Sequence, residues 1–111
     1  MKTIALNVLS EQSNQAVVQM PGRQFPGSVI QGDSLSILCA EAKEISARLK
    51  QASCADEELL YLAQEHQEKL LERLLHYQGV LAEHQISLPY SAPVESSDLV
   101  ALVPEGDSNA L

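Results

Sequence analysis

The sixteen residues from Pro21 to Ser36 constrain the path of the chain more than any other stretch. They read Pro-Gly-Arg-Gln-Phe-Pro-Gly-Ser-Val-Ile-Gln-Gly-Asp-Ser-Leu-Ser, so two Pro-Gly corners precede a short apolar run and a helix start. Each proline fixes φ and each glycine permits backbone angles that a Cβ would forbid, so the shape of this loop is specified locally. The loop is therefore either a structural corner or a binding edge, and the residues alone leave both open.

Three short segments around this loop alternate apolar and polar residues, a pattern that is typical of half-buried β-strands. They span residues 2–9, 15–20 and 28–31, and in the first of them Ile4 and Val8 lie on the same face. Short connections between consecutive strands favour antiparallel pairing. The sequence therefore predicts a three-stranded antiparallel meander, and the apolar face of such a sheet requires a cover.

Two helical patterns follow, over residues 34–52 and residues 55–84. In both, apolar residues recur at spacings of three and four, which places them along one side of a helix. The short joint between the two patterns predicts an antiparallel helical hairpin, and we expect this hairpin to cover the sheet. The expected N-caps are Asp33 or Ser34 for the first helix and Ser53, in a capping box with Asp56, for the second.

The second helix carries more apolar residues than one sheet needs. Its leucines Leu60, Leu71 and Leu75 lie beside the main stripe and would form an exposed patch in a monomer. Because the chain is small, we expect a homodimer in which two hairpins pair as a four-helix bundle.

The residues expected to face inward are Leu35, Leu38, Ala42, Ile45, Leu49 and Ala52 in the first helix and Leu59, Leu62, Ala63, His66, Leu70, Leu74, Tyr77 and Leu81 in the second.

Beyond residue 85 the helical pattern ends, and proline and serine become frequent. We expect residues 86–111 to form an extended acidic tail, in which the apolar stretch 99–103 is a docking segment. Residues 1–85 then form a single domain. The fold class predicted for the chain is α+β, with a three-stranded antiparallel meander followed by a long antiparallel helical hairpin and an extended C-terminal tail.

The charge balance narrows the choice of partners. The 111 residues include 15 acidic and 7 basic ones, so the formal net charge is −8. This excess of acidic groups argues against binding to nucleic acids and to anionic membrane surfaces, both of which attract basic proteins. The longest apolar run is far shorter than the roughly 20 residues of a membrane helix, so we expect a cytoplasmic protein without membrane contact. The acidic surface serves either solubility or the binding of a basic protein partner.

The string Gly32-Asp33-Ser34-Leu35 resembles the signature of the Gly-Asp-Ser-Leu hydrolases, in which the serine is the nucleophile. The resemblance implies an Asp-x-x-His block as well, and a nucleophilic serine needs a base that is held by a third group. None of the three histidines, His66, His76 and His84, has an aspartate three positions before it. We therefore expect an ordinary helix start here and no enzymatic activity, with a hydrolase as the less favoured alternative.

A second alternative is a site for a small anion or a nucleotide. Arginine and a helix N-terminus both bind phosphate or carboxylate, and an aromatic ring offers a stacking face. The carboxylate of Asp33 opposes this interpretation, because it would occupy the same N–H groups and repel an anion. The candidate binding residues are Arg23, Phe25, Gly32, Asp33 and Ser34.

The sequence offers no convincing set of metal ligands, and we expect neither a metal nor a cofactor. Glu72 and His76 are four residues apart on the predicted helix and could face one ion. Two ligands on one helix leave the coordination sphere unfilled, however, and neither Cys39 nor Cys54 is near them in the sequence.

The string Pro-Gly-Arg-x-Phe-Pro-Gly-x-x-x-Gln-Gly-Asp-Ser-Leu, at residues 21–35, resembles the core of a small family of uncharacterised bacterial proteins. The resemblance covers about the first half of the chain and implies a bacterial origin and a single small domain, with no activity attached. The acidic charge and the lack of an assembled catalytic set favour a non-enzymatic protein–protein interaction module. A neutralising partner of a basic protein or toxin is one example of such a module.

Overall fold

Three short strands open the fold. The structure, a computed structural model, describes residues 1–104. The strands β1 (Asn7–Ser10), β2 (Val17–Gln19) and β3 (Gly27–Ser28) form an antiparallel sheet in the order β1-β2-β3. The predicted meander is confirmed. Its strands are shorter than predicted, because a bulge in β1 and the Pro-Gly turn after β2 interrupt the pairing.

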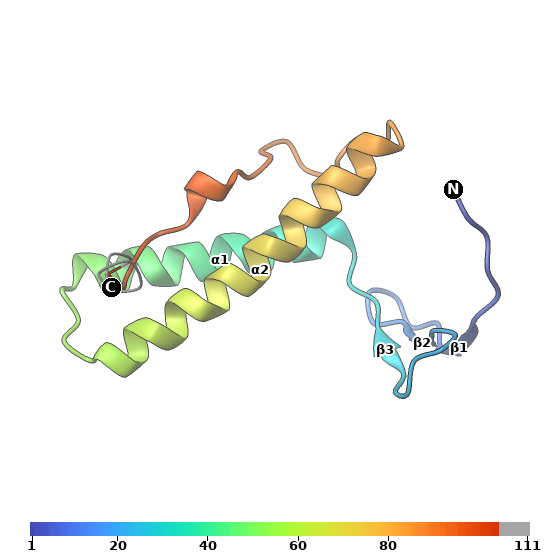
Figure 1. Ribbon diagram of the computed structural model, residues 1–111, viewed down its shortest axis with the longest axis horizontal. Helices are drawn as coiled ribbons and strands as arrows, with labels where there is room; N and C mark the ends of the chain where they lie inside the picture. Colours follow the sequence, from blue (N-terminus) through green and yellow to red (C-terminus); the bar gives the residue numbers. More distant parts are fainter. Residues whose placement is uncertain (105–111) are drawn as a thin grey trace, which may run out of the picture.

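Two long helices follow the sheet (Figure 1). The helix α1 spans Gly32–Gln51, and α2 spans Glu57–Glu83 and packs antiparallel against it. The predicted α+β fold is therefore confirmed. After α2 the chain turns back, forms the short 3-10 helix η1 (Ser96–Asp98) and runs along the hairpin toward the α1–α2 turn. Within residues 1–104, no helix has an apolar stretch of the length that crossing a membrane requires.

The hairpin does not cover the sheet, so this part of the prediction is wrong. Figure 1 places the sheet beyond the end of the hairpin at which α1 begins. Residues 29–31 join β3 to α1, and the sheet makes little contact with either helix. Apolar residues of this part, 37% to 72% exposed, are Ile4, Leu6, Val8, Leu9, Met20, Phe25, Val29 and Ile30.

The core of the protein lies along the contact between the helices. Leu74 of α2 is completely buried, and it clusters with Leu35, Cys39 and Leu71. The residues after α2 supply one wall of this core, because side chains from α2 and from the returning chain pack on the cluster. These partly buried neighbours are Leu70, Leu75, Tyr77, Tyr90, Val94 and Leu99.

Part of the predicted inward stripe lies outside the core. Leu38 and Ile45 of α1 are 41% and 54% exposed, and Leu59 and Leu62 of α2 are 42% and 58% exposed. Successive helix residues are about 100° apart, so these four lie on the side of each helix away from the returning chain. We call these four residues the open face. The prediction that they face inward is wrong, because two helices without a sheet over them bury only the strip along their contact.

The leucines predicted for a dimer interface lie in another part of the hairpin. Leu71 is 7% exposed and belongs to the core of a single chain. Leu60 and Leu75 are half-buried. The open face presents more uncovered apolar surface to a second copy than these three leucines do, and the dimer itself stays a prediction.

The start of α1 differs from the predicted one. The helix begins at Gly32, with Gln31 in the N-cap position and no side-chain capping bond. Asp33 and Ser34 therefore lie inside the first turn. The Asp33 carboxylate accepts a hydrogen bond from the Ser34 N–H at 2.8 Å and places negative charge at the positive end of the helix.

The start of α2 also needs a correction. Its N-cap is Asp56, whose Oδ1 accepts a hydrogen bond from the Leu59 N–H at 3.1 Å. Ser53, predicted as the cap, lies in the preceding turn with a φ of 50°. An N-cap residue has extended backbone angles, so Ser53 is a turn residue and Asp56 takes its place as cap.

Two glycines inside the helices differ in their surroundings and predict opposite effects. A Cβ at Gly32 would overlap the ring of Tyr77, whereas a Cβ at Gly79 would meet no other atom. We expect Gly32→Ala to lower the free energy of unfolding by about 1–2 kcal/mol, because the ring must move. Gly79→Ala should raise it by up to about 1 kcal/mol, because alanine favours a helix more than glycine does. Urea denaturation measures both, and a more stable Gly32→Ala variant would contradict the packing of Tyr77.

Candidate functional site

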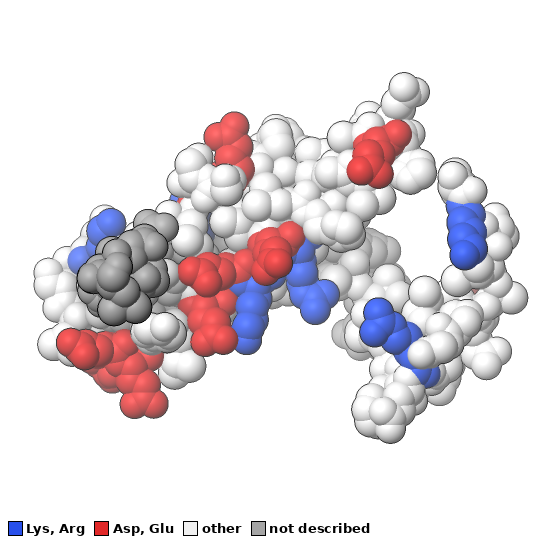
Figure 2. Space-filling view, viewed as in Figure 1, with Lys and Arg blue, Asp and Glu red and all other residues white. Residues whose placement is uncertain are grey.

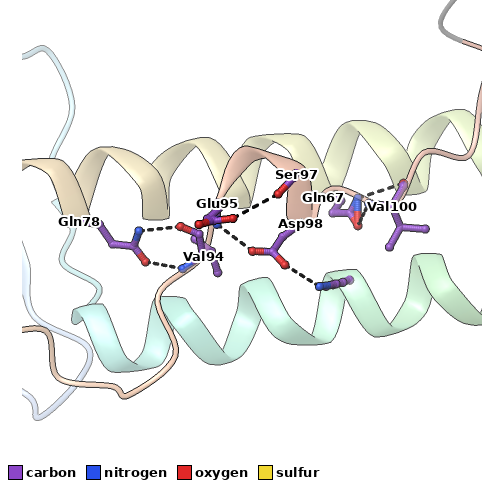
Figure 3. A network of polar contacts seen from close by, with 8 residues as sticks. Gln67, Gln78, Val94, Glu95, Ser97, Asp98 and Val100 are labelled. Carbon is purple, nitrogen blue, oxygen red and sulfur yellow. Dashed lines mark hydrogen bonds and ion pairs between the residues drawn. The ribbon is translucent and has the colours of Figure 1, made fainter.

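The most specific long-range contacts of the molecule join α2 to the residues that follow it. Residues 90–103, which we call the C-terminal segment, lie against the groove between α1 and α2 (Figure 3). Gln67 of α2 is 2% exposed, and both polar atoms of its side-chain amide form hydrogen bonds with the backbone of Val100. Its Nε2 donates to the Val100 carbonyl at 3.2 Å, and its Oε1 accepts from the Val100 N–H at 3.1 Å. Both polar atoms of this buried amide are therefore satisfied.

Two further glutamines of α2 form hydrogen bonds with the backbone of the C-terminal segment. Gln78 donates to the Val94 carbonyl at 3.0 Å, and its Oε1 accepts the Val94 N–H and the Tyr90 hydroxyl, each at 2.9 Å. The Oε1 of Gln64 accepts the N–H groups of Leu102 and Val103, at 2.6 and 2.9 Å. The apolar stretch 99–103, predicted as a docking segment, thus lies on its own chain's α2.

The sequence prediction missed these three glutamines, although the sequence carries a signal for them. Gln67 and Gln78 continue the spacing of Leu71 and Leu74, so all four lie on one side of α2. Gln64, three residues before Gln67, lies on the same side. A polar residue inside an apolar stripe indicates a buried group that requires hydrogen-bond partners.

An ion pair joins the C-terminal segment to α1. The Lys43 Nζ lies 2.9 Å from Asp98 Oδ1, and the other Asp98 oxygen accepts a hydrogen bond from the Glu95 N–H at 2.8 Å (Figure 3). The hydrogen bond from Lys43, and then the one from Glu95, hold the pKa of Asp98 below its ordinary value. Both side chains of the ion pair are partly exposed, so the pair fixes the position of the segment more than it adds stability.

The lowered pKa of Asp98 predicts that this contact is lost in acid. A carboxyl group whose pKa is lowered by folding stabilises the folded protein at pH values above its unfolded-state pKa, which is about 4. This contribution disappears as the pH falls through the folded-state pKa. We expect the Val100 N–H signal to shift in an NMR titration below about pH 4. Asp98→Asn is the control, because it removes the titrating group. The same titration curve in Asp98→Asn would show that another carboxyl group is responsible.

A cleft of about 400 Å³ remains between the C-terminal segment and the helices. Cys39 and Leu74 contribute to its apolar lining, and residues 91–94 lie over it. The ion-paired Lys43 and Asp98 are its charged lining residues. This arrangement suits an apolar group better than a polar substrate.

The titratable groups of the cleft are poorly suited to catalysis. Burial raises the pKa of the Cys39 thiol, and the nearby Asp98 carboxylate raises it further, so the thiol stays protonated near neutral pH and is a weak nucleophile. Burial likewise raises the pKa of Tyr90, whose hydroxyl is already bonded to Gln78. Neither the Cys39 thiol nor the Tyr90 hydroxyl is therefore activated as a nucleophile.

The structure does not bring the five predicted binding residues together. Arg23 lies in the exposed loop between β2 and β3, where its N–H donates to the Met20 carbonyl at 3.2 Å, and Phe25 is 72% exposed in the same loop. Gly32 and Asp33 line a separate hollow that Tyr77 shares. Among residues 1–104, Arg23 forms no ion pair with an acidic side chain. The anion site has no common pocket, and Asp33 already occupies the Ser34 N–H.

Ser34 shows no arrangement for nucleophilic attack. In the described part of the chain, no histidine is hydrogen-bonded to its hydroxyl, and the residue lies inside the first turn of α1. Glu72 and His76 line one shallow hollow with Lys69 and Arg73. Over residues 1–104, no three potential ligand side chains converge as a metal site requires.

Comparison with known proteins gives a single result. Neither curated proteins nor solved structures produced a match. A family model described as "Family of unknown function (DUF6959)" matches residues 1–90, which include the sheet, both helices and the three glutamines of the groove. The match extends well beyond the first half of the chain, and the protein belongs to this family of unknown function.

Proposed function

We propose that the protein is a non-enzymatic interaction module whose N-terminal sheet binds a partner protein. The observation that carries this proposal is the uncovered sheet. Exposed apolar side chains in its strands and in the segments and loops beside them belong to a part of the chain that makes little contact with the helices. Monomeric proteins rarely expose a contiguous apolar patch of this kind unless it binds something.

Phe25 is the best candidate for an anchor in this surface. It is the only phenylalanine in the chain and is 72% exposed at the loop between β2 and β3. Aromatic side chains bury a large area at a small loss of conformational freedom, so they often dominate binding energy at interfaces. Arg23, two residues away, adds a group that pairs with a carboxylate or carbonyl of the partner.

The charge distribution supports a basic partner. Residues 32–104 contain twelve acidic and five basic residues, whereas residues 1–31 contain one acidic and two basic ones. Figure 2 shows acidic side chains along the helices, interspersed with basic ones, and basic side chains over the sheet. An acidic hairpin beside an apolar docking surface accelerates association with a basic protein and orients it.

Capture from a lysate of the source cells tests this function. The full-length protein is immobilised, and captured proteins are compared for wild type, Phe25→Ser and the matched control Tyr61→Ser, which replaces a 64% exposed aromatic residue on α2. We expect a basic protein that is retained by wild type and Tyr61→Ser, lost with Phe25→Ser, and released more readily at high salt. Equal capture by all three proteins would exclude the sheet as the binding surface.

We also propose that two copies pair through the open face. The four residues Leu38, Ile45, Leu59 and Leu62 supply exposed apolar surface on both helices, and pairing would bury it in a four-helix bundle. Light scattering at tens of micromolar should give a dimer for wild type and for Tyr61→Lys, but a monomer for Leu62→Lys. A monomeric wild type would rule out this pairing.

A further inference from the structure

Most of the hydrogen bonds in the groove between α1 and α2 join glutamine side chains of α2 to the main chain of the bound segment. Gln67 and Gln78 each bond both the N–H and the C=O of one residue, and Gln64 takes two more N–H groups. A neighbouring β-strand offers the same paired donor and acceptor to an extended chain. These bonds would form with any segment that follows the same path, extended at the two paired positions with one 3-10 turn between them, and that lacks proline at both paired positions.

The chain's own C-terminal segment fills this groove incompletely. The cleft of about 400 Å³ beside Leu71 and Leu74 lies under Ser91, Ala92 and Pro93, whose side chains are too small to occupy it. A larger apolar side chain at one of these positions would remove more apolar surface from water. The groove therefore has room for a better occupant than the one it holds.

The match to the family model covers the residues that form the groove but almost none of the segment bound in it. The matched residues 1–90 contain all three glutamines and Lys43, whereas the paired residues Val94 and Val100 lie beyond them. The glutamines and the lysine that bind the C-terminal segment thus lie in the family region, whereas the segment beyond Tyr90 does not.

We propose that the groove is a docking site for a segment of a partner protein that is extended at both paired positions with one 3-10 turn between them, and that the C-terminal segment is a built-in competitor for it. The bound segment defines the chemistry of the partner. The partner segment needs two residues, six positions apart and equivalent to Val94 and Val100, whose N–H and C=O groups are free to bond to the glutamines. It also needs a carboxylate two residues before the second of them, equivalent to Asp98, that can pair with Lys43. It also carries a large apolar side chain two residues before the first, where this chain has Ala92.

Competition follows from the tether. A segment joined to α2 has an effective concentration of the order of millimolar, so it excludes a weak external ligand. Loosening the segment raises the fraction of open grooves and strengthens external binding by the same factor. Asp98→Lys should loosen it, because two ammonium groups would then face each other across the former ion pair.

The test measures binding of fluorescent peptides to the full-length protein by anisotropy. The probe is a peptide of residues 90–104 that carries Ala92→Leu. We expect it to bind Asp98→Lys at least about tenfold more tightly than wild type or the control Glu83→Lys, which makes the same charge change at an exposed residue at the end of α2, outside the C-terminal segment. Circular dichroism of each variant checks that both helices are retained.

Two peptide controls separate the parts of the proposal. A peptide with proline at positions 94 and 100 lacks the two N–H groups and should not bind, and the peptide with the native Ala92 should bind about tenfold more weakly than the leucine peptide. Binding of the proline peptide, or no binding of the leucine peptide to Asp98→Lys, would overturn the proposal. Displacement of the probe by unlabelled full-length protein as effectively as by the free leucine peptide would identify a second copy as the occupant and would also overturn it.

Discussion

Leu74→Ala is expected to lower the free energy of unfolding by about 3 kcal/mol, within the usual range for leucine-to-alanine changes in a core. Leu74 is completely buried and lies at the centre of the only cluster of buried apolar residues that residues 1–104 form. Both helices and the C-terminal segment meet at this side chain. Truncation of this side chain therefore leaves a cavity that the neighbouring cleft enlarges. Chemical denaturation measures the resulting loss in the free energy of unfolding.

The matched control for this change is Tyr61→Ala on the same helix, outside the open face. Tyr61 is 64% exposed, so its truncation creates no cavity and should change the free energy of unfolding by less than about 1 kcal/mol. Equal losses in the two variants would mean that the helices pack with a different face than the one described above.

Gln67→Glu is expected to be at least as destabilising, by about 3 kcal/mol at neutral pH. The substitution places a carboxylate at a side chain that is 2% exposed, opposite the Val100 carbonyl to which the Gln67 amide now donates. Burial and this carbonyl both disfavour the charged form, so the pKa of the new carboxyl group should rise. As the pH falls, this carboxyl group takes up a proton and becomes a donor again, so the stability of the variant should recover. The effect of Asp98 has the opposite direction, because its contribution to stability is lost in acid.

Gln64→Glu provides the control for this prediction, because the same change at that position keeps the contacts with the C-terminal segment. The Gln64 Oε1 accepts two N–H groups, and its amide nitrogen donates only to the Glu68 carboxylate on the same helix. A carboxylate accepts both N–H groups equally well, so we expect a change of less than about 1 kcal/mol from the added repulsion of Glu68. A large loss in Gln64→Glu with none in Gln67→Glu would contradict the hydrogen-bond pattern.

The helices were predictable because their signals are local. The predicted ranges 34–52 and 55–84 agree within two residues with Gly32–Gln51 and Glu57–Glu83, since the 3-4 spacing of apolar residues identifies a helix wherever it packs. The same spacing does not decide which side of the helix is buried. Leu35 is buried and Leu38, in the same predicted stripe, is exposed, because the cover is the C-terminal segment and not the sheet.

The groove could not be predicted in full because its contacts are long-range and made to backbone. Gln67 and Val100 are 33 residues apart, and a backbone N–H or carbonyl leaves no trace in the sequence. The position of Gln67 within an apolar stripe indicated that its side chain has a hydrogen-bond partner, but not which residue provides it. The five predicted binding residues, in contrast, were chosen from local motifs around Arg23 and Ser34, and the fold does not assemble them into one site.

The linker between β3 and α1 has a consequence for how the two ends of the molecule communicate. Within residues 1–104 the sheet and the hairpin share little packing, so the described elements provide no packed connection from the sheet to the groove. Binding free energies at the two ends should therefore add, with a coupling free energy close to zero. Two partners held in this way gain only proximity to each other, and the chain would function as a short scaffold without allosteric control.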